Sequence, residues 1–311
     1  MTEPVHVLAG VLLDAAGRVL LAQRPPGKHL AGAWEFPGGK REPGESPLAA
    51  LQRELFEELA IRDVQGAPLI RVPWRYGERD LLLDAWRLSR WRGVPTSMEG
   101  QALQWCDPLR VDPAILTPAD RPILQALRLP PRYLVTPVDV APKQRDAWFV
   151  RLRQTIERGG RLLQLRLPRW SPAQVRALAT ALLPVARRHG AQLLLDADVD
   201  GARELGEGVG VQLPGPAVAA WDERPLPWCQ PVAIRCRDDA GQLAYAAQRG
   251  VDFAVLSPVA AAAGQRGGSP AGWQTFTRVA DAVALPVYGM ADVVVGESPW
   301  ASGRGVAGVR G

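Results

Sequence analysis

Three glutamates lie three and four residues apart in one short segment of the chain, as Glu54, Glu57 and Glu58. On a helix this spacing places the carboxylates on one face, where each like-charged pair destabilises the helix by roughly a few tenths of a kcal/mol. A bound divalent cation would remove that repulsion. Because no His or Cys lies near them in sequence, the carboxylates suit Mg²⁺ or Mn²⁺ rather than zinc. Taken alone, they could equally form a solvated acidic face.

The segment that carries these glutamates has the signals of a helix. Ser46 is a good N-cap and Pro47 suits the first helical position, which predicts a helix from there to about Leu59. At about 100° per residue, the leucines of this segment fall on one stripe and the three glutamates on a neighbouring one. The predicted helix therefore packs by one face and concentrates negative charge on another.

Gly39, Glu45 and Arg53 precede the glutamates at fixed offsets and favour the metal site over the solvated face. Written as Gly-x5-Glu-x7-Arg-Glu-Leu-x-Glu-Glu-x-Ala-Ile, the pattern resembles the Nudix box at every specified position except Ala60, where the family has glycine. A residue other than glycine at this helix exit costs roughly 1–2 kcal/mol if a left-handed conformation is kept. The exchange removes no ligand, so the resemblance implies a complete catalytic motif.

The resemblance extends over nearly all of residues 4–128 and points to the MutT subgroup, the 8-oxo-dGTP diphosphatases. It implies that Mg²⁺, with Mn²⁺ as a substitute, is bound by one backbone carbonyl and four carboxylates: Gly38, Glu54, Glu57, Glu58 and Glu99. The implied catalytic residues are Glu54, Glu57 and Glu58. Among them, Glu54 is the leading candidate to orient or deprotonate water.

The same resemblance implies which residues contact the substrate and which support the loop. Implied substrate contacts are Arg24, His29, Phe36, Gly38, Arg79 and Asp120. Gly39, Glu45 and Arg53 are implied to be structural, with the last two pairing to hold the loop against the helix. The implied reaction is attack of water at the β-phosphorus of a nucleoside triphosphate, which yields a monophosphate and pyrophosphate. Its implied role is the removal of 8-oxo-dGTP from the nucleotide pool, which protects DNA replication.

Base recognition is where the chain departs from the subgroup. The subgroup has asparagine where Asp120 stands, and the whole sequence contains no asparagine. An ionised carboxylate accepts hydrogen bonds from guanine N1–H and N2–H₂, or from N7–H of 8-oxoguanine, and repels the N1 acceptor of adenine. We therefore expect a guanine-like base. A broader Nudix hydrolase acting on other nucleoside diphosphate derivatives stays open.

Two consecutive prolines, Pro130 and Pro131, divide the chain. They forbid helix and follow a helix predicted over Pro118–Leu127. We therefore expect one domain over residues 1–129 and a second over residues 130–311.

The expected fold class is α/β in both domains: a Nudix α/β/α sandwich with a mixed sheet, then a compact (β/α)₈ TIM-like barrel. In the first domain, apolar runs over residues 5–13 and 19–24 flank a turn and predict a hairpin. In the second, eight short apolar runs recur between helical segments, which predicts a parallel barrel. These runs are Tyr133–Thr136, Leu162–Leu167, Gln192–Asp196, Val209–Leu213, Val232–Cys236, Phe253–Leu256, Val287–Tyr288 and Gly305–Gly308.

The second domain resembles thiamine-phosphate synthase over residues 132–311, with a degraded motif set. Pro168 stands where the family has a lysine that contacts pyrophosphate, Ala197 stands where it has a magnesium-binding aspartate, and the second acidic ligand expected near Ala217 is missing. Without those charges we expect thiamine-phosphate synthesis to be lost. The segments after the last two strands lie where barrels commonly bind phosphate, so a phosphate-containing ligand and a simple scaffold stay equally open.

Composition limits the partners. The chain is 47% hydrophobic and 22% charged over 311 residues, as in a globular protein of two domains. Its excess of five positive charges lies wholly after residue 130 as scattered arginines, so we expect a small-molecule nucleoside triphosphate as partner and no long nucleic acid. No apolar run approaches a membrane span and no signal peptide is recognisable, so we expect no membrane partner and a cytoplasmic location. The three cysteines are isolated and should be reduced.

Two other classes of function stay open. In one, an inactive first domain binds nucleotide and reports its occupancy to the barrel, although the intact carboxylates argue against this. In the other, the protein is bifunctional and retains thiamine-phosphate synthesis in the barrel.

Overall fold

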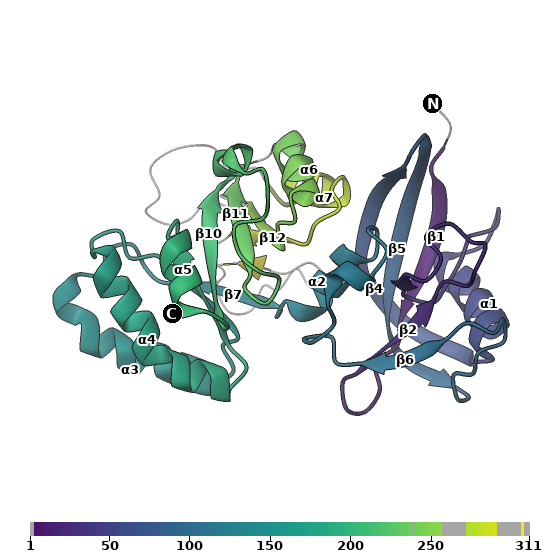
Figure 1. Ribbon diagram of the computed structural model, residues 1–311, viewed down its shortest axis with the longest axis horizontal. Helices are drawn as coiled ribbons and strands as arrows, with labels where there is room; N and C mark the ends of the chain where they lie inside the picture. Colours follow the sequence, from purple (N-terminus) through teal and green to yellow (C-terminus); the bar gives the residue numbers. More distant parts are fainter. Residues whose placement is uncertain (1–2, 238, 257–271, 291–305, 308–311) are drawn as a thin grey trace. The chain divides into compact units, whose positions relative to one another are not determined.

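The computed structural model of the protein describes residues 3–237, 239–256, 272–290 and 306–307. These residues divide into two compact units, one ending at Arg128 and the other beginning at Leu129. Figure 1 shows strands and a few helices in the first unit and strands flanked by helices in the second. No helix within the described ranges is long and apolar enough to cross a membrane.

The first unit contains two three-stranded sheets. One sheet has the order β1 (Val5–Val11), β5 (Arg79–Arg92), β4 (Arg62–Tyr76), with β1 parallel to β5 and β4 antiparallel to it. The other is antiparallel, in the order β3 (Trp34–Glu35), β2 (Val19–Gln23), β6 (Leu103–Cys106). The mixed sheet expected from the sequence is thereby confirmed.

The hairpin predicted from the first two apolar runs forms only at its turn. β1 and β2 lie in different sheets, and they meet at a single bridge between Leu13 and Val19 and a hydrogen bond from Leu20 N to Leu12 O of 3.1 Å. Residues 8 to 12 are all buried, as in a strand covered on both faces. That continuous burial suits β1 to a central sheet with β5 rather than to an isolated hairpin.

Helix α1 (Pro47–Leu59) begins and ends where the sequence predicts. The Ser46 hydroxyl accepts a hydrogen bond from Ala49 N at 3.2 Å, and the helix ends at Ala60 in the left-handed conformation with φ 57°. Leu51, Leu55 and Leu59 are 0% exposed and pack into the core between the helix and both sheets. Truncating one of these leucines to alanine would cost about 2–5 kcal/mol.

Helix α2 (Arg121–Arg128) begins three residues later than predicted. Asp120 N donates to Thr117 O in a turn, and the Asp120 carbonyl accepts the first α-helical hydrogen bond, from Leu124 N at 3.2 Å. Residues 118–120 therefore form a turn that leads into the helix. Figure 1 shows α1 and α2 on opposite sides of the β1-β5-β4 sheet, and η1 (Pro113–Ile115) precedes α2.

The second unit is a closed parallel barrel, as predicted. Its strands, in order around the barrel, are β7 (Arg132–Val135), β8 (Leu162–Leu165), β9 (Gln192–Asp196), β10 (Val209–Pro214), β11 (Val232–Cys236), β12 (Phe253–Leu256), β13 (Val287–Met290) and β14 (Val306–Ala307). The connecting helices are η2 (Pro142–Gln144), α3 (Arg145–Glu157), α4 (Pro172–Arg188), α5 (Val199–Leu205), η3 (Gly215–Ala220), α6 (Ala240–Gln248) and α7 (Gly272–Asp281). The outer residues of the predicted last strand, 305 and 308, lie outside the described residues.

Two apolar cores hold the barrel. One lies between the strands and the surrounding helices. The other fills the barrel interior with Tyr133, Leu162, Leu194, Ala233, Phe253, Val255 and Tyr288. Because side chains alternate along a strand, residues two positions after these interior ones also face inward, nearer the carboxyl ends of the strands.

Candidate active site

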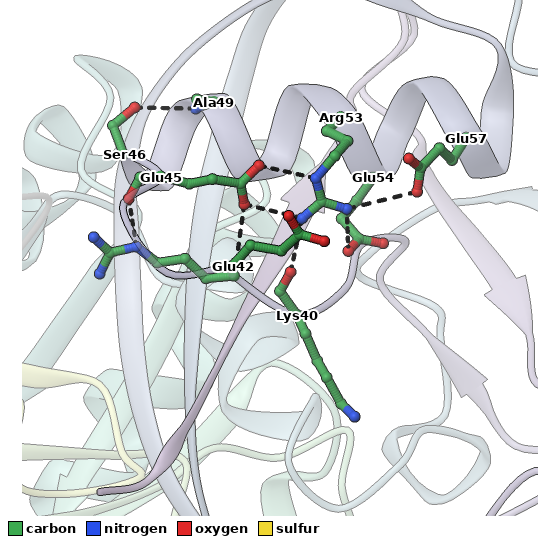
Figure 2. Close-up of polar contacts among 9 residues, drawn as sticks. Lys40, Glu42, Glu45, Ser46, Ala49, Arg53, Glu54 and Glu57 are labelled. Carbon is green, nitrogen blue, oxygen red and sulfur yellow. Dashed lines mark hydrogen bonds and ion pairs between the residues drawn. The ribbon is translucent and has the colours of Figure 1, made fainter.

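The Arg53 guanidinium joins the loop before α1 to the acidic face of the helix (Figure 2). Its Nε and Nη2 donate to the two carboxylate oxygens of Glu45 at 2.9 and 3.0 Å, and Nη2 also donates to Lys40 O at 3.0 Å. Its Nη1 donates to Glu54 Oε1 at 2.8 Å. The hydrogen bonds from Arg53 and from Glu42 N lower the pKa of Glu45 to about 2. Arg53 therefore fixes the loop and positions Glu54 at once.

Two glycines bring the loop backbone against the carboxylates of α1. A Cβ on Gly38, whose φ is +148°, would lie 2.2 Å from Leu8 O, and a Cβ on Gly39 would lie 2.1 Å from Glu54 Oε2. Gly38 N donates to Glu58 Oε2 at 3.0 Å. A side chain at either position would displace the backbone or the carboxylate, so only glycine fits both.

The segment that carries Glu99 is tied to the end of α1. Met98 N and Gln101 Nε2 both donate to Glu58 O, at 3.0 and 3.2 Å, and Glu99 N donates to Gln101 Oε1 at 3.0 Å. The Glu99 carboxylate is 46% exposed and pairs with Lys28 Nζ at 3.2 Å. These contacts place Glu99 beside the helix turn that carries Glu58, although the two are far apart in sequence.

Negative charge accumulates around Glu58. Burial raises the pKa of its carboxyl, the hydrogen bond from Gly38 N lowers it, and the carboxylates of Glu35, Glu99 and Glu54 add to the rise; together these effects bring the pKa to about 8. Such a cluster is stabilised by a cation, and its donors are all oxygens. The residues present therefore fit Mg²⁺ or Mn²⁺.

Ion pairs with Arg53 and Lys28 hold the carboxylates of the predicted metal ligands apart. Within the described ranges, no three Asp, Glu, His or Cys side chains lie close enough together to form a ready-made metal site. Arg53 holds Glu54 and also lies 3.5 Å from Glu57, whose carboxylate is 55% exposed, and Lys28 holds Glu99. If the carboxylates of Glu54, Glu57, Glu58 and Glu99 were to bind one ion, the side chains of Glu57 and Glu99 would have to turn toward the other two.

Arg24 and His29 lie together beside this cluster. The Arg24 guanidinium donates from Nη1 to Glu35 Oε2 and from Nε to His29 O at 2.6 Å. Burial raises the pKa of the Glu35 carboxyl, and the adjacent Arg24 lowers it. The His29 ring packs edge-on against Tyr76 with a centroid separation of 5.2 Å, and the Arg24 guanidinium is 23% exposed.

Asp120 is the buried acid among the candidate substrate contacts. It is 5% exposed, its Oδ1 accepts from Phe36 N at 3.1 Å, and its Oδ2 accepts from the Thr117 hydroxyl. Burial raises the pKa of its carboxyl to about 7. Phe36 is 4% exposed and packs into the core. The structure does not join Arg79 to this group: its exposed side chain makes no hydrogen bond or ion pair with other described residues.

Three residues of the site were not identified as such from the sequence: Gln101, Lys28 and Glu35. Gln101 is 8% exposed and connects Glu99 to the end of α1 across 43 positions of sequence. Such a separation leaves no local spacing signal. Glu35 and Lys28 have no spacing signal of their own, and only the fold shows that they face Arg24 and Glu99.

The barrel segments predicted to bind phosphate are described only in part. Gly289 and Met290 end β13, while residues 291–292 and 308–311 lie outside the described residues. Gln164 and Arg166, within the region that resembles thiamine-phosphate synthase, lie at the carboxyl end of β8. Ala197 follows β9 in the left-handed conformation, with φ 57°.

Each of the two domains matches a known protein family. Residues 8–126 match the family model of the NUDIX domain, and residues 132–310 match that of thiamine monophosphate synthase. The chain is 41% identical to the CTP pyrophosphohydrolase of Escherichia coli K12 over 122 residues, which cover 39% of this chain and 90% of that protein. It is 40% identical to the 8-oxo-dGTP diphosphatase of Proteus vulgaris, over 32% of this chain and 88% of that protein. The 8-oxo-dGTP diphosphatase of E. coli K12 is 29% identical, over 40% of this chain and 98% of that protein.

The match to thiamine monophosphate synthase spans more than half of the chain, and the matches to the two diphosphatases and the CTP enzyme span nearly their whole lengths. The glycine loop, the Glu45–Arg53 pair and the acidic face of α1 lie inside the NUDIX match, and the closed barrel lies inside the other. The chain therefore belongs to the Nudix hydrolase family through residues 8–126 and to the thiamine monophosphate synthase family through residues 132–310.

Proposed function

We propose that the first domain hydrolyses a nucleoside triphosphate to a monophosphate and pyrophosphate with Mg²⁺, and that 8-oxo-dGTP is the substrate. The observation that carries the proposal is the close approach of the Gly38–Gly39 backbone to the carboxylates of Glu54 and Glu58. Two relatives named 8-oxo-dGTP diphosphatase support the choice of substrate. Because this substrate belongs to the nucleotide pool, we infer a cytoplasmic location.

Glu54 is suited to orient or deprotonate the attacking water. Arg53 donates to its Oε1, while its Oε2 faces Gly39 and accepts no hydrogen bond from any described residue. One oxygen is thus anchored and the other is available to accept a proton. A carboxylate held in this way needs no rearrangement before it acts, which is how positioned general bases gain efficiency.

Glu54 and the other acidic residues of the site would hold the metal. Glu54, Glu57, Glu58, Glu99 and the Gly38 carbonyl are the proposed ligands. When bound, Mg²⁺ or Mn²⁺ would neutralise phosphate charge and favour ionisation of the attacking water. Gly38 N, by donating to Glu58 Oε2, holds that carboxylate toward the loop whose carbonyl completes the set.

Arg24 and Lys28 would bind the phosphates. Each is paired with a glutamate in the structure, Arg24 with Glu35 and Lys28 with Glu99. Phosphate oxygens can replace one carboxylate oxygen on either cation, and a metal ion taking up Glu99 would release Lys28 for this purpose. The triphosphate would then lie between these cations and the acidic face of α1.

The test is release of pyrophosphate from 8-oxo-dGTP by the purified chain with Mg²⁺. We expect Glu54→Gln and Glu57→Gln to lower turnover by about 100-fold or more, because each removes a charge needed for water activation or metal binding. Glu78→Gln, on an exposed residue between β4 and β5, is the matched control and should leave turnover unchanged. Normal activity in both site variants would refute the assignment.

A second candidate substrate is CTP. It is favoured by the relative of 41% identity and by Asp120, whose carboxylate can accept from the N4 amine of cytosine as well as from guanine N–H groups. Comparing the rates of hydrolysis of 8-oxo-dGTP, dGTP, CTP and nucleotide sugars distinguishes between the two candidate substrates. Preference for CTP would replace the proposed substrate, and equal use of nucleotide sugars would favour a broader Nudix hydrolase.

A further inference from the structure

Five polar side chains gather inside the barrel at the carboxyl ends of its strands. Gln164 on β8, Asp196 at the end of β9 and Arg235 on β11 each lie two residues after an interior apolar residue, and Gln212 on β10 pairs in register with Asp196 and Ala233. Arg166 follows β8 and is two residues beyond Gln164. Along β8, Gln164 lies one inward-facing position deeper than Arg166, and Gln212 pairs in register with Ala233, which lies one inward-facing position deeper than Arg235. We call these two glutamines the floor of the group.

Each of the two floor glutamines, Gln164 and Gln212, has a polar atom without a hydrogen-bond partner. Gln164 Nε2 donates to Asp196 Oδ1 at 2.9 Å, and the Tyr133 hydroxyl donates to Gln212 Oε1. This leaves Gln164 Oε1 as an acceptor and Gln212 Nε2 as a donor, each without a partner, on side chains that are 0% and 1% exposed. Buried polar atoms are nearly always hydrogen-bonded, so such a pair of orphans calls for an additional bound group.

The layer above the floor carries unbalanced positive charge. Arg235 Nη1 is buried without a hydrogen bond and lies 4.0 Å from Asp196 Oδ1. The Arg166 guanidinium is half-buried and makes no hydrogen bond or ion pair with any described residue. Burial and the neighbouring Arg235 both lower the pKa of Arg166. Two guanidinium groups therefore face one carboxylate, which leaves an excess of one positive charge.

The magnesium and diphosphate expected of this family do not fit these residues. Ala197 supplies no carboxylate where one is expected. Asp198 is engaged elsewhere: both of its oxygens accept from Arg176 at 2.7 Å, and Oδ1 also caps α5 through Gly201 N. Asp196 is thus the one carboxylate in the polar group, and it already accepts from Gln164. A cation here would meet two arginines.

We propose that this end of the barrel binds a phosphoryl anion directly through Arg166 and Arg235, without a metal ion. Two guanidiniums match phosphate oxygens by paired hydrogen bonds. A hydrogen phosphate group also carries both a P–OH donor and P–O acceptors, which an ionised carboxylate does not. It can therefore serve the orphan acceptor of Gln164 as well as the orphan donors of Gln212 and Arg235.

The experiment titrates inorganic phosphate into the full chain by calorimetry, in the presence of EDTA and again with Mg²⁺. We expect binding in both conditions, weakened about tenfold or more by Arg166→Met or Arg235→Met, since each removes a charge-assisted pair. Asp196→Asn should tighten binding, because it removes the competing carboxylate. Arg188→Met, on an exposed arginine at the end of α4, removes the same charge elsewhere and should have no effect.

A second readout assigns the binding to the barrel. Phosphate should protect Arg166 and Arg235 from modification by phenylglyoxal, as mapped by mass spectrometry, and it should do so without Mg²⁺. If Arg235→Met fails to fold, the proposal is still tested by Arg166→Met, at the more exposed of the two arginines, and by the pattern of protection from phenylglyoxal. Binding that needs Mg²⁺, binding that both arginine variants retain in full, or the absence of protection at both arginines would overturn the proposal.

Discussion

The Glu54 carboxylate occupies the space that a side chain on Gly39 would need, because a Cβ there would lie 2.1 Å from Glu54 Oε2. The helix thus carries its reactive carboxylate directly against the backbone of a loop that precedes it by 15 positions. A side chain at position 39 would therefore displace the Glu54 carboxylate.

Gly39→Ala should therefore abolish activity while the fold survives. The added methyl would push Glu54 away from Arg53, and we expect turnover to fall about 100-fold or more, as for loss of a positioned catalytic group. Gly17→Ala is the control, because Gly17 has φ +76° in open space and should lose only stability, by about 1 kcal/mol. The measurements are pyrophosphate release and the midpoint of thermal unfolding. Full activity in Gly39→Ala would contradict the close approach.

Arg53→Lys should impair metal use rather than folding. Lysine keeps the charge, but it cannot contact Glu45, Glu54 and Lys40 O together as the guanidinium does. We expect turnover to fall about tenfold and half-maximal activity to need more Mg²⁺. Arg18→Lys, in an exposed pair with Asp14, should change neither quantity. An unchanged Mg²⁺ dependence would show that Arg53 only stabilises the fold.

Ala60→Gly should stabilise the protein, by about 1 kcal/mol, because it relieves the left-handed conformation at the end of α1. Ala49→Gly, at an exposed position inside the same helix, should instead destabilise it by about 1 kcal/mol. Urea unfolding of the two variants checks the opposite signs. A loss of stability in Ala60→Gly would mean that the helix exit is not strained.

Asp120 should make stability depend on pH. The unfolded chain releases this proton near pH 4 and the folded protein near pH 7, so the folded state binds an extra proton between these values. The contribution of Asp120 to the free energy of unfolding therefore falls as pH rises through this window. The advantage of Asp120→Asn over the parent should grow from about pH 5 to pH 8 in urea unfolding. Asp63→Asn, 70% exposed, should show no such trend.

The local signals in the sequence were sufficient for α1 and for the barrel. Ser46, Pro47 and the leucine stripe act within one helix, and the barrel strands are short apolar runs whose order is dictated by right-handed crossovers. Partners distant in sequence were harder to predict. The separation of β1 from β2 depends on β5, which lies some 70 residues later, and the hydrogen bonds of Gln101 depend on where α1 ends.

Spacing alone placed Glu54, Glu57 and Glu58 on one helix face, whereas Glu99 and the pairing of Glu45 with Arg53 were implied by the family resemblance. Arg53 and Glu45 are eight residues apart across the start of a helix, a distance that local rules can handle. Lys28 and Glu99 are separated by 71 positions, and their contact requires the whole first domain to be folded. The same is true of Asp120, whose buried carboxyl meets Phe36 N only through the fold.

The last turn of α1 ends in carbonyls that serve as anchors: Glu58 O and Leu59 O accept from Met98 N and Thr96 N, both at 3.0 Å. Fraying of that single turn would release the segment bearing Glu99 and misdirect Glu58 in the same event. Helix termini open at much lower free energy than sheets do. On warming, the enzyme should consequently lose activity reversibly at temperatures at which the backbone amides of its strands are still fully protected from hydrogen exchange with solvent.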